Sequence, residues 1–109
     1  MARQDALQGS LPLLVLKILA RRGPLHGYAI AVQIEGISED ILRVEEGSLY
    51  PALHRMEEAG WIKAKWATTE SKRRVRAYDV TAAGRKQLDG ELVRWRSITA
   101  AVDAVLDQA

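Results

Sequence analysis

Residues 46–81 read EGSLYPALHRMEEAGWIKAKWATTESKRRVRAYDVT, and this stretch decides the fold. Its first part has apolar side chains at helical spacing and ends at Gly60, a residue type that is common at helix C-termini. After Gly60 the pattern changes to two segments rich in Trp, Ile, Val and Tyr, which a polar turn joins. The stretch therefore predicts a helix over residues 46–59 and a β-hairpin with strands over residues 61–69 and 75–81.

Two more helices are predicted before this stretch. Apolar residues recur at helical spacing from Ser10 onward, so Ser10 is the expected N-cap and Pro12 falls in the first turn, and a Gly-Pro pair ends the helix. A second helix is expected over residues 27–35, with Tyr28 among its inward-facing side chains. The connector that follows is expected to contain one short extended pairing near residues 43–44.

The last predicted helix begins after Thr81, its expected N-cap, and continues to about Leu106. Its apolar side chains fall at alternating steps of four and three residues, which is the heptad seam of a helix that packs on another helix. The seam predicts dimerisation, and the alternative is that this helix folds back on the first helix of its own chain. The seam consists of Leu88, Leu92, Trp95, Thr99 (its weak member), Val102 and Leu106.

Three short helices, a hairpin and a long helix are the layout of a winged helix-turn-helix protein with a C-terminal dimerisation helix. The predicted fold class is therefore mainly α with a small β-hairpin. In such proteins the third helix enters the major groove of DNA, and the hairpin, or wing, lies along the DNA backbone. The chain divides into a flexible N-terminus or start of the first helix (1–9), a DNA-binding domain (10–80) and a dimerisation helix (81–109).

The length of 109 residues corresponds to one domain, and 48% hydrophobic with 28% charged residues is a globular composition. The absence of Cys excludes disulfide scaffolds, thiol catalysis and Cys-ligated zinc. The two histidines, His26 and His54, are expected on different elements, so neither a nucleophile–base pair nor a metal-ligand set is recognisable. The sequence predicts a protein that is not an enzyme and uses no cofactor.

The N-terminal residues do not indicate a membrane or secreted protein. Residues 1–10 contain Arg3 and Asp5 and lack the apolar region of a signal peptide. The longest apolar stretch, residues 11–16, is far too short to cross a bilayer. We expect a cytoplasmic protein without a membrane partner.

The hairpin concentrates the positive charge of the chain. The net charge is only +2, from 16 Lys and Arg against 14 Asp and Glu, but residues 61–78 hold six basic residues and one acidic residue, Glu70. Such clustering is typical of a surface that binds DNA phosphates. The alternative is a solvated hairpin whose charges prevent edge-to-edge aggregation.

The third helix adds side chains that can donate to phosphates or base edges, although four glutamates make it acidic. Glu45 and Glu46 suit the helix N-terminus, whereas Glu57 and Glu58 are expected to face away from DNA. The acidic character of this helix leaves open an alternative function, in which the chain is a module that binds proteins and not DNA. For Tyr50, the alternative role is packing on the base of the wing. The candidate DNA-binding residues are Ser48, Tyr50, His54, Arg55, Lys72, Arg73, Arg74 and Arg76.

These motifs resemble the PadR family of bacterial transcriptional regulators. The resemblance extends from about Leu7 to Leu106, and its most specific part is GSLYPAL at residues 47–53. With its single C-terminal helix, the chain looks like the short form of the family. The other similar segments are LHGYAI at 25–30, Trp61-Ile62 after Gly60, Arg73-Arg74 to Tyr78, and Thr81-Ala82-Ala83-Gly84.

The resemblance implies a homodimer, formed through the first and last helices, that represses genes by binding double-stranded DNA at inverted repeats. It implies DNA contacts for Tyr50, Arg73 and Arg74. In the short-form subgroup it also implies a dimer interface that holds a small aromatic effector, with Trp95 facing that site. One departure is Glu45, which stands where the family commonly has a Ser or Thr N-cap, so a weaker cap is expected.

Overall fold

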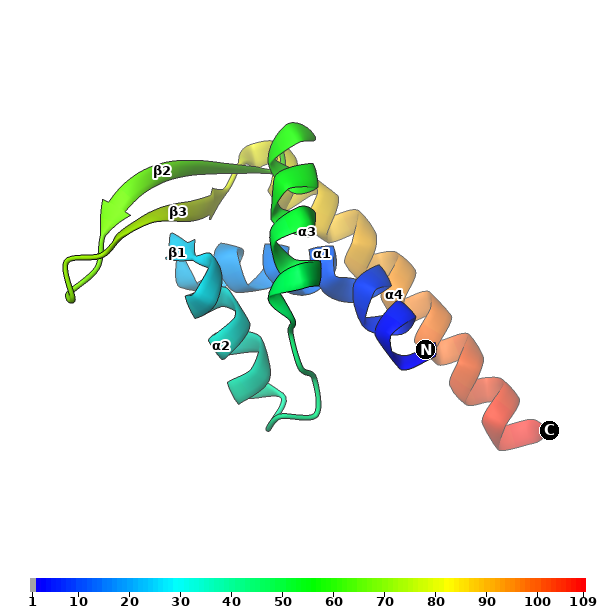
Figure 1. Ribbon diagram of the computed structural model, residues 1–109. Coiled ribbons are helices and arrows are strands. Elements are labelled where there is room, and N and C mark those ends of the chain that lie inside the picture. Colours follow the sequence, from blue (N-terminus) through cyan, green and yellow to red (C-terminus); the bar gives the residue numbers. More distant parts are fainter. Residues whose placement is uncertain (1) are drawn as a thin grey trace.

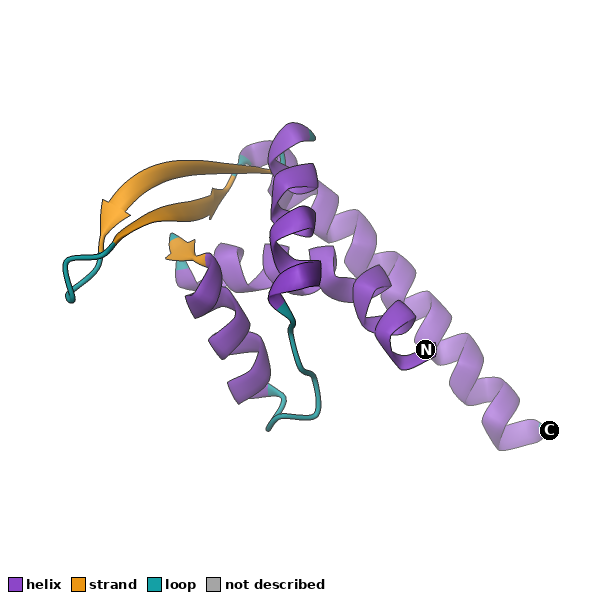
Figure 2. Cartoon of the chain, in the orientation of Figure 1, coloured by secondary structure: helices purple, strands orange, loops and turns teal. Residues whose placement is uncertain are grey.

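The structure is a computed structural model that describes the backbone of residues 2–109 and the side chains of residues 9–109. Within these residues the chain forms four helices and a small antiparallel sheet, which confirms the predicted fold class (Figure 2). None of the described helices is long and apolar enough to span a bilayer. The elements are α1 (Ala2–Arg22), β1 (Leu25–His26), α2 (Gly27–Ile37), α3 (Glu46–Glu58), β2 (Ile62–Thr68), β3 (Arg74–Val80) and α4 (Ala82–Gln108).

Helix α1 contacts α2, α3, α4 and strand β3, so the core is built around its apolar side chains. The wing extends from one side of this core, and the C-terminal part of α4 extends from the other (Figure 1). Helices α2 and α3 lie on the side of the core toward which the wing curves (Figure 1). The largest fully buried side chains are Leu11, Val15, Leu16, Leu19, Ile30, Leu49, Leu53, Met56 and Ile62.

The end of α3, the base of the wing and the start of α4 meet at Thr81. The Thr81 side-chain oxygen accepts a hydrogen bond from the Gly84 N–H at 3.0 Å, which confirms Thr81 as the N-cap. Its hydroxyl donates to the Gly60 carbonyl oxygen at 2.6 Å, and its backbone N–H donates to the Trp61 carbonyl oxygen at 3.0 Å. One threonine therefore fixes three elements relative to each other.

Two expectations about the first helices are wrong. Helix α1 begins at Ala2, so Ser10 lies inside the helix and not at its N-cap, and Pro12 is an internal proline. Proline is favoured in a first turn, but it also occurs inside longer helices, where it removes one backbone hydrogen bond and crowds the preceding turn. Pro12 therefore does not mark the start of α1. Tyr28 is 67% exposed, because it lies two residues before the buried Ile30 and so on the opposite side of α2.

The connector between α2 and α3 also differs from the prediction. Residues 43–44 form no strand, and instead the Val44 N–H donates to Glu35 Oε2 at 2.8 Å. The third strand of the sheet is β1, with Leu25 opposite Tyr78 and His26 opposite Ala77. A two-residue strand has no periodicity of its own, so local pattern could not reveal it.

Gly84 allows the first turn of α4 to approach the base of the wing. A Cβ at this position would overlap the Trp61 carbonyl oxygen and lie 2.8 Å from Val80 Cγ2. We expect Gly84→Ala to lower the free energy of unfolding by about 1–3 kcal/mol, as overpacking does. Urea unfolding at one fixed protein concentration measures this change.

Gly90→Ala is the matched control for this change. Gly90 lies on the same helix, with nothing within 4 Å of an added Cβ. Alanine there is expected to raise the free energy of unfolding by about 1 kcal/mol through its helix propensity. Equal stabilities of the two variants would contradict the packing at Gly84.

Candidate nucleic-acid interface

The register of the wing sorts its side chains onto two faces. Ile62 is opposite Val80, and Trp66 is opposite Arg76, so alternate residues from both strands share a face. Ile62 and Val80 are buried in the core, so their face is the inner one, and it also presents Trp66, Arg74 and Arg76. Lys63 and Lys65 occupy the outer face and are exposed. Of the six basic residues predicted as one cluster, the four that lie on the strands are therefore divided between two directions.

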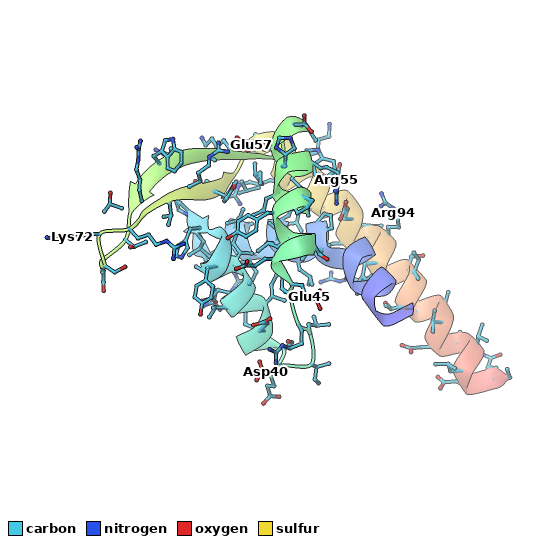
Figure 3. The ribbon with its side chains drawn as sticks, viewed as in Figure 1. Asp40, Glu45, Arg55, Glu57, Lys72 and Arg94 are labelled. Atoms are coloured by element: carbon cyan, nitrogen blue, oxygen red, sulfur yellow. The ribbon has the colours of Figure 1, made fainter. Side chains whose placement is uncertain are left out.

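Arg76 joins the wing to α3 through an ion pair. Its Nη2 lies 2.9 Å from Glu57 Oε2, and its Nη1 lies 3.4 Å from Oε1. Glu57 thus faces the wing, and Figure 3 shows it on that side of α3. The expectation that Glu57 faces away from DNA stays a prediction, and the Arg76 guanidinium neutralises the Glu57 charge where it lies. Arg76 acts as a link between two elements, which reduces its availability to DNA.

Tyr50 lies beside the first turn of α2 and is 43% exposed. A methyl group at Gly27 would lie 2.8 Å from the Tyr50 Cε1 and Oη atoms, so the ring lies directly against this glycine. The ring therefore packs on the start of α2, and not only on the base of the wing. This contact holds the Tyr50 hydroxyl at the open side of α3.

A concave surface of about 1200 Å³ lies between the wing, the start of α2 and the N-terminal half of α3. Tyr50 lines it together with Arg73, Arg74 and Arg76, so four of the predicted DNA-binding residues meet there. The acidic side chains on its lining are Glu46 and Glu70. Such a surface offers phenolic and guanidinium donors to an elongated anionic partner.

The other predicted DNA-binding residues do not line this surface. Arg55 lies five residues from Tyr50, about 140° around α3, and Figure 3 shows it on the side of α4. His54 is exposed, and its Nε2 lies 3.6 Å from Glu58 Oε1. Ser48 is half-buried on the flank of α3, and Lys72 is at the tip of the wing with a positive φ of 64°.

Besides the buried Tyr78, three aromatic residues on the concave surface were absent from the predicted site. Trp66 is 59% exposed on the inner face of the wing. His26 and Tyr28 stack with their ring centroids 6.4 Å apart at the start of α2. The Trp66 position is readable from strand alternation, since it shares parity across the hairpin with Arg74 and Arg76. The position of His26 depends on β1 and had no local signal.

The predicted dimerisation seam divides into two parts along α4. Leu88 is only 6% exposed in the core of its own chain, so its assignment to a dimer interface is corrected. Leu92 is partly buried against the same core. Beyond them Trp95 is 47% exposed and Val102 51% exposed, as α4 leaves the domain. The remaining large exposed apolar residues of α4 are Val93, Ile98, Val105 and Leu106.

A model of the transcriptional regulator PadR-like family matches residues 15–90, which is more than half of the chain. The chain belongs to the PadR-like family. This confirms the resemblance drawn from the sequence motifs. The family is one of transcriptional regulators.

Solved structures with high similarity are transcriptional regulators of the same fold. One from Clostridium thermocellum has a TM-score of 0.83 at 26% identity and covers 92% of this chain and 96% of its own. A PadR-like regulator from Bacillus cereus has a TM-score of 0.80 at 25% identity, with 96% and 98% covered. A PadR family regulator from Eggerthella lenta has a TM-score of 0.81 at 26% identity, with 97% and 89% covered.

The PadR-like chain also matches two curated relatives whose names give no activity. An uncharacterised protein X of Lysinibacillus sphaericus is 22% identical over 107 residues, which are 98% of this chain and 97% of its own. An uncharacterised 37.1 kDa protein of transposon TN4556 from Streptomyces fradiae is 44% identical over 79 residues. That match includes 72% of this chain but only 21% of the transposon protein.

The buried Tyr78 makes the free energy of unfolding depend on pH. Burial raises the pKa of its hydroxyl above the ordinary value of 10.0, although the nearby Arg76 acts in the opposite direction. The unfolded chain releases this proton at a lower pH than the folded chain does, so the free energy of unfolding falls as the pH rises above about 10. Tyr78→Phe is expected to make this fall smaller. Urea unfolding between about pH 8 and 11 tests it, and an unchanged pH dependence would contradict the burial effect.

Proposed function

We propose that this PadR-like protein is a dimeric transcriptional repressor that binds an inverted-repeat operator in double-stranded DNA. Helix α3 enters the major groove, and the inner face of the wing binds the adjacent phosphates. Two symmetric domains bind half-sites about one helical turn, ~34 Å, apart. The regulatory role follows from the family, and the assignment of DNA contacts to residues is our proposal.

The observation that supports this function is the composition of the concave surface. Arg73 and Arg74 of the wing and Tyr50 of α3 all line it. Among the described residues no carboxylate forms an ion pair with either arginine, so both remain available for phosphates. The DNA-binding residues that we propose are these three, with Ser48, His54, Arg55 and Lys72 as flanking contacts and Arg76 as a link to α3.

The alternative function is a winged-helix module that binds another protein and not DNA. Its support was the acidic character of α3. That support is weaker now, since Glu57 is paired with Arg76 and Glu58 lies beside His54. The pairing lowers the repulsion that α3 would exert on DNA phosphates.

Dimerisation is proposed through the exposed part of α4. This part extends beyond the domain (Figure 1). Its exposed residues Trp95, Ile98, Val102 and Leu106 share one side of the helix by their spacing of three and four residues. Exposed apolar side chains in such a row are stabilised when a second copy covers them. The partner that we propose for this row is the same chain, related by a two-fold axis.

A small aromatic effector at the dimer interface is a second proposal, supported by the exposure of Trp95. Trp95 is 47% exposed on the part of α4 that leaves the domain, and the site that we propose is built from residues of both copies. Titration with planar aromatic compounds, followed by Trp fluorescence and operator affinity, tests the proposal. No response in either signal would contradict it.

Selection from a randomised duplex pool at about 150 mM salt tests the proposed function directly, because non-specific binding is weak there. We expect enrichment of an inverted repeat, which reports both DNA recognition and two-fold symmetry. Enrichment of no sequence, by folded and dimeric protein, would favour the protein-binding alternative.

Arg73 and Lys63 are two basic residues of the wing that can be compared to test the phosphate contacts. Arg73→Ala is expected to weaken binding to every duplex, and to make the slope of log affinity against log salt shallower by about one. Lys63→Ala removes the same charge from the outer face and is expected to change the slope little. Gel-shift or anisotropy titrations at several salt concentrations measure both. Equal effects of the two changes would remove the concave surface that Arg73 lines from the mechanism.

The dimer proposal is tested by introducing charge on two sides of α4. Val102→Asp places a carboxylate in the exposed apolar row, and we expect monomers, since burying an unpaired charge is unfavourable. Ala104→Asp is the control, because it lies about 200° around the same helix and is also exposed. Analytical ultracentrifugation measures the oligomeric state. A dimeric Val102→Asp variant would exclude this interface.

A further inference from the structure

Trp66 is an exposed indole with a specific partner. It is 59% exposed on β2, although side chains of this size are usually well buried. The guanidinium carbon of Arg74 lies 4.6 Å from the centroid of its ring. Trp66 is opposite Arg76, and Arg74 is opposite Thr68, so Arg74 is the diagonal neighbour of Trp66 on the inner face. The two side chains form a cation–π pair at the rim of the concave surface.

The neighbouring arginines of the inner face have different surroundings. Arg76 is held by the Glu57 carboxylate, at 2.9 Å. No carboxylate of the described residues pairs with Arg74, so its charge is not compensated by an acid. The indole therefore supplies the contact that orders Arg74 without neutralising it.

A stacked guanidinium keeps its hydrogen-bonding capacity. Stacking on an aromatic ring uses the face of the group, whereas its five N–H donors lie in the plane and point outward. Binding to a phosphate normally requires immobilising a long side chain, which weakens association. An arginine that is already held against a ring loses less freedom when it binds.

We propose that Trp66 is a positioning residue that holds the Arg74 guanidinium on the inner face of the wing for contact with a phosphate of duplex DNA. This inference rests on the proposed function, because it requires that the inner face meets DNA. Trp66 carries no charge, and its contribution to DNA binding comes from the position in which it holds Arg74. The matched control is Lys65, which is adjacent on β2, exposed, and directed to the outer face.

The stack itself is tested in the free protein, without DNA. In NMR spectra of the full chain, ring-current shielding displaces the Arg74 Nε–H resonance. We expect Trp66→Ala to shift this resonance toward the position of an unstacked arginine, and Lys65→Ala to leave it in place. No shift in Trp66→Ala would overturn the stack, whatever the protein does with DNA.

The consequence for DNA binding is tested on a mixed-sequence duplex of about 30 base pairs, at salt concentrations from about 50 to 200 mM, since phosphate contacts are independent of sequence. We expect Trp66→Ala to weaken binding by about 2- to 5-fold, the factor that an exposed cation–π contact provides. The salt slope is unchanged, because the positive charge remains. Arg74→Ala makes the slope shallower by about one. Trp66→Phe recovers part of the affinity, since a smaller ring still stacks.

The double variant decides between positioning and a direct contact of the indole. In an Arg74→Ala background, Trp66→Ala is expected to have no further effect, as coupled residues show. Independent, multiplying losses would mean that the indole contacts DNA by itself, and would overturn the proposal. Wild-type affinity in Trp66→Ala would also overturn it. If the wild-type chain binds no duplex, the proposed function fails, and the NMR result still decides whether the stack exists.

Discussion

The architecture depends on the junction at Thr81, where the last residues of α3, the base of the wing and the first turn of α4 are tied together. The Thr81 side chain caps α4 through Gly84 and donates to the Gly60 carbonyl at the end of α3. Gly84 is required because a side chain there would enter the space of the Trp61 backbone. Displacing this junction would move the wing relative to α3, and with it the concave surface where the proposed DNA contacts meet. The same junction sets the direction in which α4 leaves the domain.

Charge pairing gives the concave surface its character. The wing concentrates positive charge in sequence, but its pleat sends Lys63 and Lys65 away from the helices and Arg74 and Arg76 toward them. Arg76 and Glu57 neutralise each other, which removes one acid from the exposed side of α3. What remains at the surface is a set of donors with few acceptors. This is the arrangement that a polyanion requires, and an overall charge of +2 would not reveal it.

The sequence predicted the larger elements because their patterns are local. Apolar residues at helical spacing and the glycine after α3 were sufficient for the helices, and alternation around a polar turn was sufficient for the hairpin. The prediction failed where pattern is absent or ambiguous. Strand β1 is two residues long and exists only because β3 lies beside it. Tyr28 has an apolar ring but lies on the exposed side of α2. Pro12 was assigned to the first turn of α1, whereas the helix begins at Ala2.

By itself, the sequence determined the order of elements, the cap at Thr81, the basic character of the wing and the family to which the chain belongs. These properties depend on residue type and spacing along one segment. Only the tertiary structure decided which side chains face each other: Arg76 with Glu57, Arg74 with Trp66, and the Tyr50 ring on Gly27. It also decided that Leu88 belongs to the core while Val102 is exposed, although both lie on one heptad seam. The physical reason is that a seam or an alternation fixes the direction of a side chain, whereas the length and position of neighbouring elements fix what it meets.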